Sequence, residues 1–257
     1  MDYLEYIQNQ VSRGKWSFSS KEMADILGIP PKDKLTTLRR RGRIISPARG
    51  FHVIVPEEYI HSGRLPVERY IDQLMNYFSL PYYVGLLTAA SYYGSSHQSP
   101  LSFQVVTSRD KRNIRIANNR ILFYRKKNAA VIPVTKRKTA TGYFNVSTPE
   151  ATFLDLVEFH RQVGGLGHVG LVVSEMVEQL SPRAFREIAH HYTNAVVQRG
   201  AYLLELLDQR RCCEVLDVYF RDHRPIYTYL NPSGKKDRTN RHPRWKLFIN
   251  ETIDVEQ

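Results

Sequence analysis

Cysteine is scarce in this 257-residue chain, which has only two, adjacent at Cys212 and Cys213. Neighbouring cysteines rarely form a disulfide, and two are too few for a disulfide framework or a cysteine-based zinc site. Long apolar runs are also missing, since no stretch approaches the roughly 18 consecutive apolar residues of a membrane helix. The first residues, MDYLE, carry acids where a signal peptide carries bases. The sequence therefore predicts a cytoplasmic protein with reduced, buried thiols and no membrane partner.

The common signatures of catalysis are missing as well. The chain has no P-loop, no G-x-S-x-G nucleophile elbow and no H-E-x-x-H zinc motif. A G-x-G-x-x-G match at Gly165, Gly167 and Gly170 follows a segment of helical periodicity, whereas a dinucleotide site needs a preceding strand, so we interpret it as an interhelical loop. His190 and His191 are adjacent on a predicted helix and point to different faces, which is poor metal geometry. We therefore expect no enzyme activity, no catalytic residue, no metal site and no cofactor.

Acidic residues are few relative to basic ones. The chain has 25 Asp+Glu against 37 Lys+Arg, a formal net charge of +12, which favours a polyanionic partner. The surplus lies in three blocks: 10 basic against 5 acidic residues in 1–55, 11 against 1 in 101–140, and 7 against 2 in 221–245. Because neutral or acidic stretches separate the blocks, the sequence predicts at least two basic surfaces.

Three helices and a hairpin are predicted in the N-terminal block. Apolar residues repeat with helical spacing over 2–11. The S-x-x-E pattern that begins at Ser19 is a capping box, and the helix that it starts ends at Gly28. Pro31 suits the first turn of a third, basic helix, and alternating residues over 44–55 predict a β-hairpin. This order is that of a winged helix-turn-helix.

The basic helix and the hairpin carry the residues that would touch DNA. The second helix of such a pair enters the major groove, so its outward face needs cations for phosphates and short polar groups for base edges. The predicted DNA-binding residues are Lys32, Lys34, Thr36, Thr37, Arg39, Arg40 and Arg41 on the helix, with Arg43 and Arg49 in the wing. The alternative is a solvated basic helix in an unrelated helical subdomain. Which arginine would meet a base and which a phosphate stays open.

In the rest of the chain the spacing of apolar residues alternates between that of helices and that of strands. The patterns predict helices over 67–79 and 82–94, strands near 103–106, 114–116, 121–124, 131–134 and 143–146 with a turn at Asn118-Asn119, a helix from Ser147 through Phe159, and mostly helix over 169–220. The predicted fold class is α+β, with an N-terminal winged helix-turn-helix in residues 1–60. A larger mixed α/β domain in residues 61–257 has a small sheet and C-terminal helices.

A second basic surface is predicted on the strands of the middle region. Its residues are Arg109, Lys111, Arg112, Arg115, Arg120, Arg125, Lys126 and Lys127, and Lys136-Arg137-Lys138 adds a cluster in a loop or hairpin. Only Asp110 opposes them, an imbalance that solubility alone hardly explains, so we interpret this block as a second polyanion-contacting surface. Charged protection of a sheet edge is the alternative.

Several sequence blocks resemble the AbiE-type antitoxins (AbiEi-like), the transcriptional regulators of type IV toxin–antitoxin systems. They are SSKEMADILGI, LTTLRRRGRI and ARGFHVIVPEEY, then YYVGLLTAASYYG, FQVVTSRDKRNIRI and FNVSTPEATFLDLVEF. The resemblance spans about residues 17–160 and implies a role in phage defence. It implies an N-terminal domain that represses its own operon by binding inverted repeats in double-stranded promoter DNA. It also implies a C-terminal domain that neutralises a nucleotidyltransferase-fold toxin without a stable complex.

Two other functions stay open. One is a stand-alone winged-helix transcription factor whose C-terminal domain senses a ligand or partner, and a neighbouring toxin gene would argue against it. The other is a metal-dependent nuclease, which would usually need clustered carboxylates to hold its metal. The basic strands contain only Asp110, so we expect no cleavage of DNA with Mg²⁺ or Mn²⁺.

Overall fold

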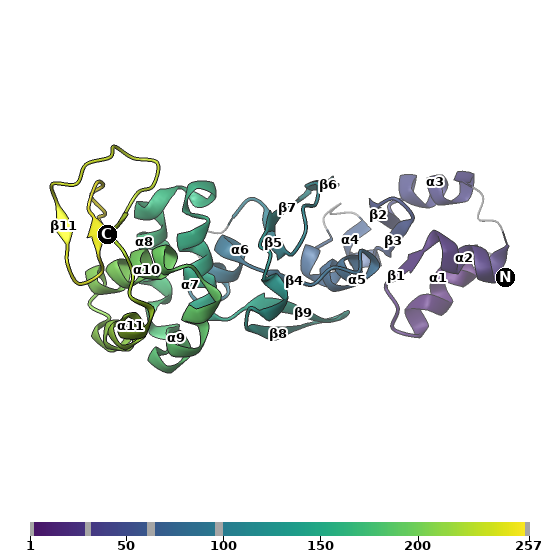
Figure 1. The fold of residues 1–257 in the computed structure, drawn as a ribbon. Coiled ribbons are helices and arrows are strands. Elements are labelled where there is room, and N and C mark those ends of the chain that lie inside the picture. The colour runs from purple at the N-terminus through teal and green to yellow at the C-terminus, as the bar shows by residue number, and fades with distance from the viewer. Residues whose placement is uncertain (1–2, 29–31, 61–64, 96–99, 255–257) are drawn as a thin grey trace. The chain divides into compact units, whose positions relative to one another are not determined.

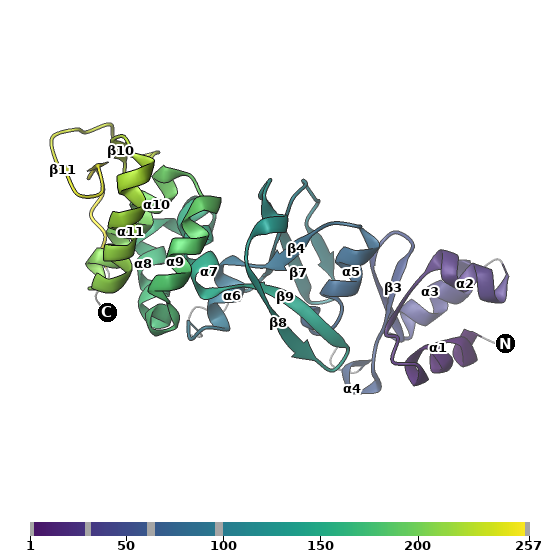
Figure 2. The same ribbon diagram turned by 60° about the horizontal axis from the view of Figure 1, so that its bottom comes forward.

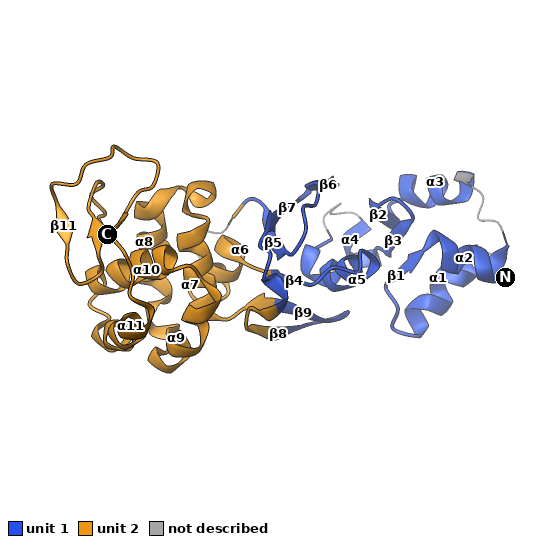
Figure 3. Ribbon diagram, in the orientation of Figure 1, with its two compact units in different colours: residues 1–83, 101–130, 136–145 blue, residues 84–100, 131–135, 146–257 orange. Residues whose placement is uncertain are grey.

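The computed structural model describes residues 3–28, 32–60, 65–95 and 100–254 (Figure 1). The chain forms two compact units, one of residues 1–83, 101–130 and 136–145 and the other of residues 84–100, 131–135 and 146–257 (Figure 3). Both helices and strands are plentiful, so the predicted mixed α+β class is confirmed. No helix in the described ranges is long and apolar enough to cross a membrane.

The first unit begins with three helices, seen in Figure 2, and a three-stranded antiparallel sheet of order β1-β3-β2. The elements are α1 (Tyr3–Ser12), β1 (Ser17–Ser19), α2 (Ser20–Leu27), α3 (Lys32–Arg40), β2 (Ile44–Ala48) and β3 (Phe51–Ile54). Ser19 and Glu22 form the predicted capping box: the Ser19 hydroxyl accepts from Glu22 N at 3.0 Å, and Ser19 N donates to the Glu22 carboxylate at 2.6 Å. Gly28 ends α2 as predicted, and Pro31 lies outside the described residues. The short strand β1 was not predicted, because three residues are too few to show a period.

A six-stranded sheet of order β6-β7-β5-β4-β9-β8 follows. Its strands are β4 (Tyr82–Val84), β5 (Phe103–Thr107), β6 (Ile114–Ile116), β7 (Asn119–Arg125), β8 (Val134–Thr139) and β9 (Gly142–Ser147), with η2 (Ala129–Val131) between β7 and β8. The helices α4 (Glu57–Ile60), η1 (Val67–Arg69) and α5 (Ile71–Tyr77) come between β3 and β4 in the chain. The helix predicted over 82–94 is wrong at its start. All three residues of β4 are buried, and a short, wholly buried run has no period that separates strand from helix. The helix itself begins at Leu86.

Two further predictions on this sheet need correction. The strand expected over 131–134 begins only at Val134, because η2 ends at Val131, and it continues through Lys136-Arg137-Lys138, which were expected in a loop or hairpin. The turn between β6 and β7 is Ala117-Asn118 rather than Asn118-Asn119. Asn119 already pairs with Ile116, and Ala117 takes the left-handed conformation with φ 47°.

The second unit is mainly helical. Its helices are α6 (Leu86–Ser91), α7 (Pro149–Glu158), η3 (His160–Val163), α8 (Gly165–Met176), η4 (Val177–Gln179), α9 (Pro182–Ile188), η5 (Ala189–His191), α10 (Asn194–Leu206) and α11 (Arg210–His223). A small sheet follows, made of β10 (Thr228–Tyr229), β11 (Arg241–His242) and β12 (Leu247–Phe248) in the order β10-β12-β11. Gly165, Gly167 and Gly170 lie in α8, which corrects the predicted loop; the buried face of this helix supplies the periodicity that outweighs the glycines. The segment before it is helical, as predicted.

The two cysteines lie in α11 of this unit. Cys212 and Cys213 are free and buried, in agreement with the sequence. Burial raises the pKa of Cys212 to about 11 and that of Cys213 to about 12, so both are protonated thiols at neutral pH.

Candidate nucleic-acid interface

Helix α3 is fixed by one face and exposes the other. Leu35 and Leu38 are 9% and 5% exposed and pack in the core of α1, α2 and the small sheet. The side chains turned outward are those of Lys34, Thr37, Arg39 and Arg40, followed by Arg41 just after the helix, while Thr36 is half-buried. The side chain of Lys32 is outside the described part of the chain. The structure therefore gathers the predicted helix residues around one exposed, basic surface.

The outward side chains make only weak local contacts. The Arg39 guanidinium donates to the Thr36 hydroxyl at 3.1 Å, and the Thr37 hydroxyl donates to the Asp33 carbonyl at 2.9 Å. Lys34 Nζ lies 6.0 Å from the centroid of the Tyr3 ring. No ion pair joins Arg39 or a neighbouring arginine of α3 to a carboxylate within the described residues. Their charge is therefore available to an anionic ligand.

The hairpin β2–β3 places the two predicted wing arginines differently. Arg49 is exposed at the tip, beside Gly50, whose φ of 77° makes the tight turn, and its carbonyl accepts from the Tyr77 hydroxyl at 2.9 Å. Arg43 precedes β2 and donates to the Glu57 carboxylate at 2.9 Å. Part of the Arg43 charge is thus neutralised, whereas Arg49 forms no ion pair with any residue that the structure describes.

A buried histidine ties the hairpin to α2. His52 is 5% exposed, with Nε2 2.9 Å from the Ser20 hydroxyl and Nδ1 2.8 Å from the Ser46 hydroxyl. Burial, with a smaller contribution from the Arg39 charge, lowers the pKa of His52 to about 4. The ring is therefore neutral at physiological pH, and one nitrogen donates while the other accepts. No local sequence signal could reveal this link, because the two serines lie on separate elements.

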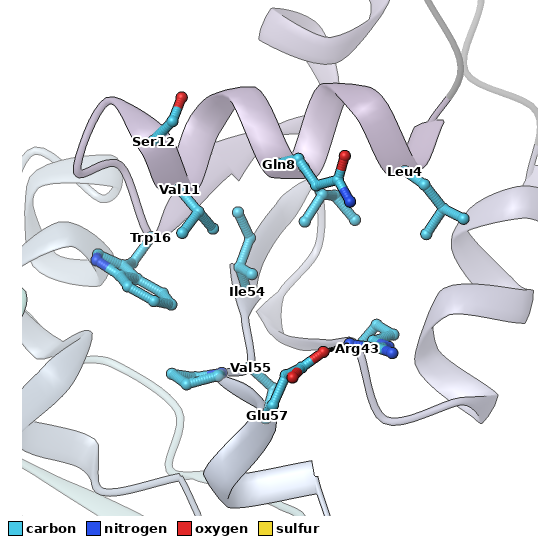
Figure 4. A pocket seen from close by; sticks show the side chains of 11 residues that line it. Leu4, Gln8, Val11, Ser12, Trp16, Arg43, Ile54, Val55 and Glu57 are labelled. Atoms are coloured by element: carbon cyan, nitrogen blue, oxygen red, sulfur yellow. Dashed lines mark hydrogen bonds and ion pairs between the residues drawn. The ribbon is translucent and has the colours of Figure 1, made fainter.

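A groove runs between α1 and the end of β3. It has a volume of about 530 Å³ and is lined by apolar side chains that include Leu4, Val11 and Trp16, as Figure 4 shows. The ion pair of Arg43 and Glu57 lies across the groove from α1 (Figure 4). This groove was not predicted, because its walls come from separate parts of the chain: α1, Trp16, Arg43, and the end of β3 with the residues that follow it.

The predicted second basic surface is only partly assembled. Arg115 on β6 lies directly across from Arg120 on β7, and Arg125 pairs with Asp110 at 2.9 Å. Lys111 Nζ lies 3.2 Å from the centroid of the Phe78 ring, and burial lowers the pKa of Lys111. Arg109, Arg112 and Lys127 are exposed. Lys126, in contrast, is 5% exposed and so adds nothing to an exposed surface.

The β6–β7 hairpin lies close to the β2–β3 hairpin. Strand β6 contacts β2 within the first unit. Strands β6 and β8 also form the two edges of the six-stranded sheet, and both carry cations, with Lys136 and Lys138 exposed on β8. Charged side chains on edge strands also prevent edge-to-edge aggregation of sheets, and this role alone would explain the cations of β6 and β8. The like-charged pair of Arg115 and Arg120 is less easily explained in that way, because facing like charges destabilise a hairpin.

Known proteins support the family that the sequence suggested. Residues 83–206 match the family model of the AbiEi antitoxin C-terminal domain. The chain thus carries a domain of the AbiE-type antitoxin family, which confirms the resemblance, and the match supports an antitoxin role. Among solved structures, the RV2827C protein from Mycobacterium tuberculosis has a similar fold, with a TM-score of 0.64, 14% identity, and coverage of 94% of this chain and 89% of that chain. No curated protein matches the chain.

Proposed function

We propose that this chain is the antitoxin of a type IV toxin–antitoxin system and that it also represses its own operon. In this proposal residues 1–60 are a winged helix-turn-helix that binds promoter DNA, and residues 61–257 are the antitoxin domain. DNA binding is supported chiefly by the two faces of α3. One face buries two leucines, and the other exposes arginines that have no carboxylate partner among the described residues. The antitoxin part is supported by the matching domain in residues 83–206.

The proposed docking follows from the two faces of α3. A helix that enters the major groove must be held rigidly, so that its outer side chains keep their register on the bases. Leu35 and Leu38 supply that anchoring. The flanking turn and wing would hold phosphates through Arg41 and Arg49, while Thr37 and Arg40 face the base edges.

We further propose that the β6–β7 hairpin contacts phosphates beside the wing. The facing Arg115 and Arg120 repel each other in the free protein. A phosphate near both guanidinium groups would remove this repulsion and form charge-assisted hydrogen bonds. The contact of β6 with β2 would make this one continuous footprint with the wing.

The partner proposed for the antitoxin domain is a nucleotidyltransferase-fold toxin, neutralised without a stable complex. This part rests on the family resemblance and on the matching domain. We propose no catalytic activity, metal or cofactor for the chain itself.

DNA binding is tested with the double variant Arg40→Ala/Arg41→Ala on a fragment of the chain's own promoter. The lost phosphate contact of Arg41 should lower the slope of log K against log[salt] by about 1, and the lost base contact of Arg40 should weaken binding further. The matched control is Arg183→Ala/Arg186→Ala, which removes two exposed arginines from α9. Equal affinity and slope for the α3 variant and the wild type would refute the recognition-helix assignment.

The proposed separation of DNA binding and antitoxin function into two domains is tested by co-expression with the product of the adjacent gene. If that product is toxic, the wild-type chain should restore growth, and the α3 double variant should restore it too while failing to repress a promoter reporter. Loss of rescue by a stably folded α3 variant would contradict the proposed two-part division. Growth arrest that the wild-type chain does not relieve would contradict the antitoxin role for that pair.

A further inference from the structure

The third basic block of the sequence, near the C-terminus, surrounds a small sheet with two different faces. Across the strands, Tyr229, Phe248 and Arg241 lie directly opposite one another, as do Thr228, Leu247 and His242. Residues in register across a sheet share a face. Leu247 is fully buried, so its row faces the helices of the second unit, and the row of Tyr229, Phe248 and Arg241 faces outward.

The outward face is a cluster of aromatic rings. The Phe248 ring centroid is 5.1 Å from that of Tyr227 and 5.2 Å from that of Tyr229. Tyr227 is 38% exposed, and the two other rings are half-buried. Three adjoining rings at a surface are more than the isolated apolar side chains that a surface normally carries.

Cations surround these rings without acidic partners. Lys236 Nζ lies 4.6 Å from the Tyr229 centroid, and the guanidinium carbons of Arg238 and Arg241 lie 5.6 and 5.7 Å from the Phe248 centroid. Arg238 also donates to the Tyr229 hydroxyl at 3.1 Å. None of the three forms an ion pair with a carboxylate of the described residues.

A nearby arginine shows the contrast. Arg244, on the connection between β11 and β12, donates to the Asp217 carboxylate at 2.7 Å and to the Glu205 carboxylate at 2.9 Å. That arginine anchors the segment to α10 and α11, and its charge is neutralised. Within the described ranges the cations over the rings meet no carboxylate: Lys236 donates to the Pro232 carbonyl at 2.5 Å and Arg241 to the Arg238 carbonyl at 3.3 Å, which leaves their charge available to a ligand.

The face is also held rigidly from beneath. Arg199 on α10 donates to the carbonyls of Tyr229 and Leu230 at 2.9 to 3.1 Å. Gln198 donates to the carbonyls of Ile226 and Trp245 at 2.9 and 2.8 Å. Because the backbone of this face is already fixed, little conformational entropy is lost when a ligand binds, and this favours affinity.

We propose that this face, formed by Tyr227, Tyr229 and Phe248 with Lys236, Arg238 and Arg241, binds unpaired nucleotides of RNA. Aromatic rings stack with bases of any sequence, guanidinium planes stack in the same way, and the cations meet the phosphates. A duplex hides its base faces, so the face selects single strands. Folded RNA presents such strands in loops and ends. The site belongs to the second unit and is independent of the proposed DNA-binding helix.

The test measures fluorescence anisotropy of a labelled 12-nucleotide oligouridylate with the full chain. Each stacked base contributes roughly five- to 150-fold in affinity. Tyr227→Leu/Phe248→Leu keeps the apolar bulk and removes two rings, so the Kd should rise at least fivefold, with Kd for promoter duplex unchanged. Tyr227→Trp should retain binding because it retains a ring. Ile226→Ala is the matched control, since this 81% exposed neighbour has no ring.

A second measurement locates the bound RNA directly. Photo-crosslinking of a 4-thiouridine oligonucleotide to the wild-type chain, mapped by mass spectrometry, should yield adducts within residues 226–248. An unchanged Kd for the double-leucine variant, or adducts confined to 32–49 and 109–138, would overturn the proposal. So would tighter binding of oligothymidylate DNA than of oligouridylate. Loss of promoter repression in the α3 variant, in contrast, bears only on the proposed DNA-binding function.

Discussion

Acidification should loosen the β2–β3 hairpin, because His52 is held neutral in the folded protein. The pKa of His52 falls from an ordinary value of 6.5 to about 4, chiefly through burial between Ser20 and Ser46. Between those two values the unfolded chain binds a proton at His52 that the folded chain does not, so folding stability rises with pH. The stabilisation is fully present above pH 6.5 and is lost progressively as the pH falls towards 4.

The size of the effect follows from the shift. One pKa unit corresponds to about 1.4 kcal/mol, so the complete loss is about 3 kcal/mol, of which about 2.5 kcal/mol falls between pH 7 and pH 4.5. Hydrogen exchange of the amides in residues 44–54, read by mass spectrometry and corrected for intrinsic rates, gives the opening free energy of the hairpin at each pH. His52→Gln keeps a donor and an acceptor but cannot titrate, so it serves as the control.

The difference between the two proteins isolates the histidine from the carboxylates that also titrate in this range. The wild-type hairpin should lose about 2.5 kcal/mol more than the His52→Gln hairpin between pH 7 and pH 4.5. Equal losses in the two proteins would refute the reasoning, as would a directly measured pKa near 6.5 for His52 by NMR of a chain labelled in its histidine rings.

Three further predictions concern stability. Ser19→Ala removes the N-cap of α2 and should cost about 1 kcal/mol in the opening free energy of that helix, whereas Ser19→Asp should cost little. Gly94→Ala should lower the melting temperature of the chain, because the new Cβ would lie 2.9 Å from the Glu175 carbonyl oxygen at a φ of 117°; a calorimetric scan identical to wild type would contradict this contact. Glu205→Ala leaves the buried indole N–H of Trp245 without its acceptor and should cost about 1–3 kcal/mol in urea unfolding, while Glu205→Gln should recover much of it.

Signals carried by a few neighbouring residues were predicted well. The capping box at Ser19 and the end of α2 at Gly28 are visible in the sequence because the groups that satisfy each other lie within one turn. The start of α7 is also visible in the sequence, because its N-cap Thr148 and its first residue Pro149 are neighbours. The charge blocks, and the outward position of the arginines of α3, likewise follow from composition and helical period.

Predictions failed where the decisive partner lies far along the chain. Tyr82–Val84 became a strand because the segment pairs with β9, and the pairing of Val84 with Val146 has no signature in either segment. The glycines of α8 entered a helix because its apolar face is buried, and tertiary burial overrides low helix propensity.

The sequence by itself determined how much positive charge this protein carries and in which blocks. Only the tertiary structure decided which cations are free. Arg43 and Arg244 meet carboxylates 14 to 39 residues away, and Lys126 is buried, whereas Arg40 and Arg241 face outward without such partners in the described residues. The physical reason is that the availability of a charge depends on the distance to its counter-charge and on solvent access. Both are set by packing between segments that are remote in sequence.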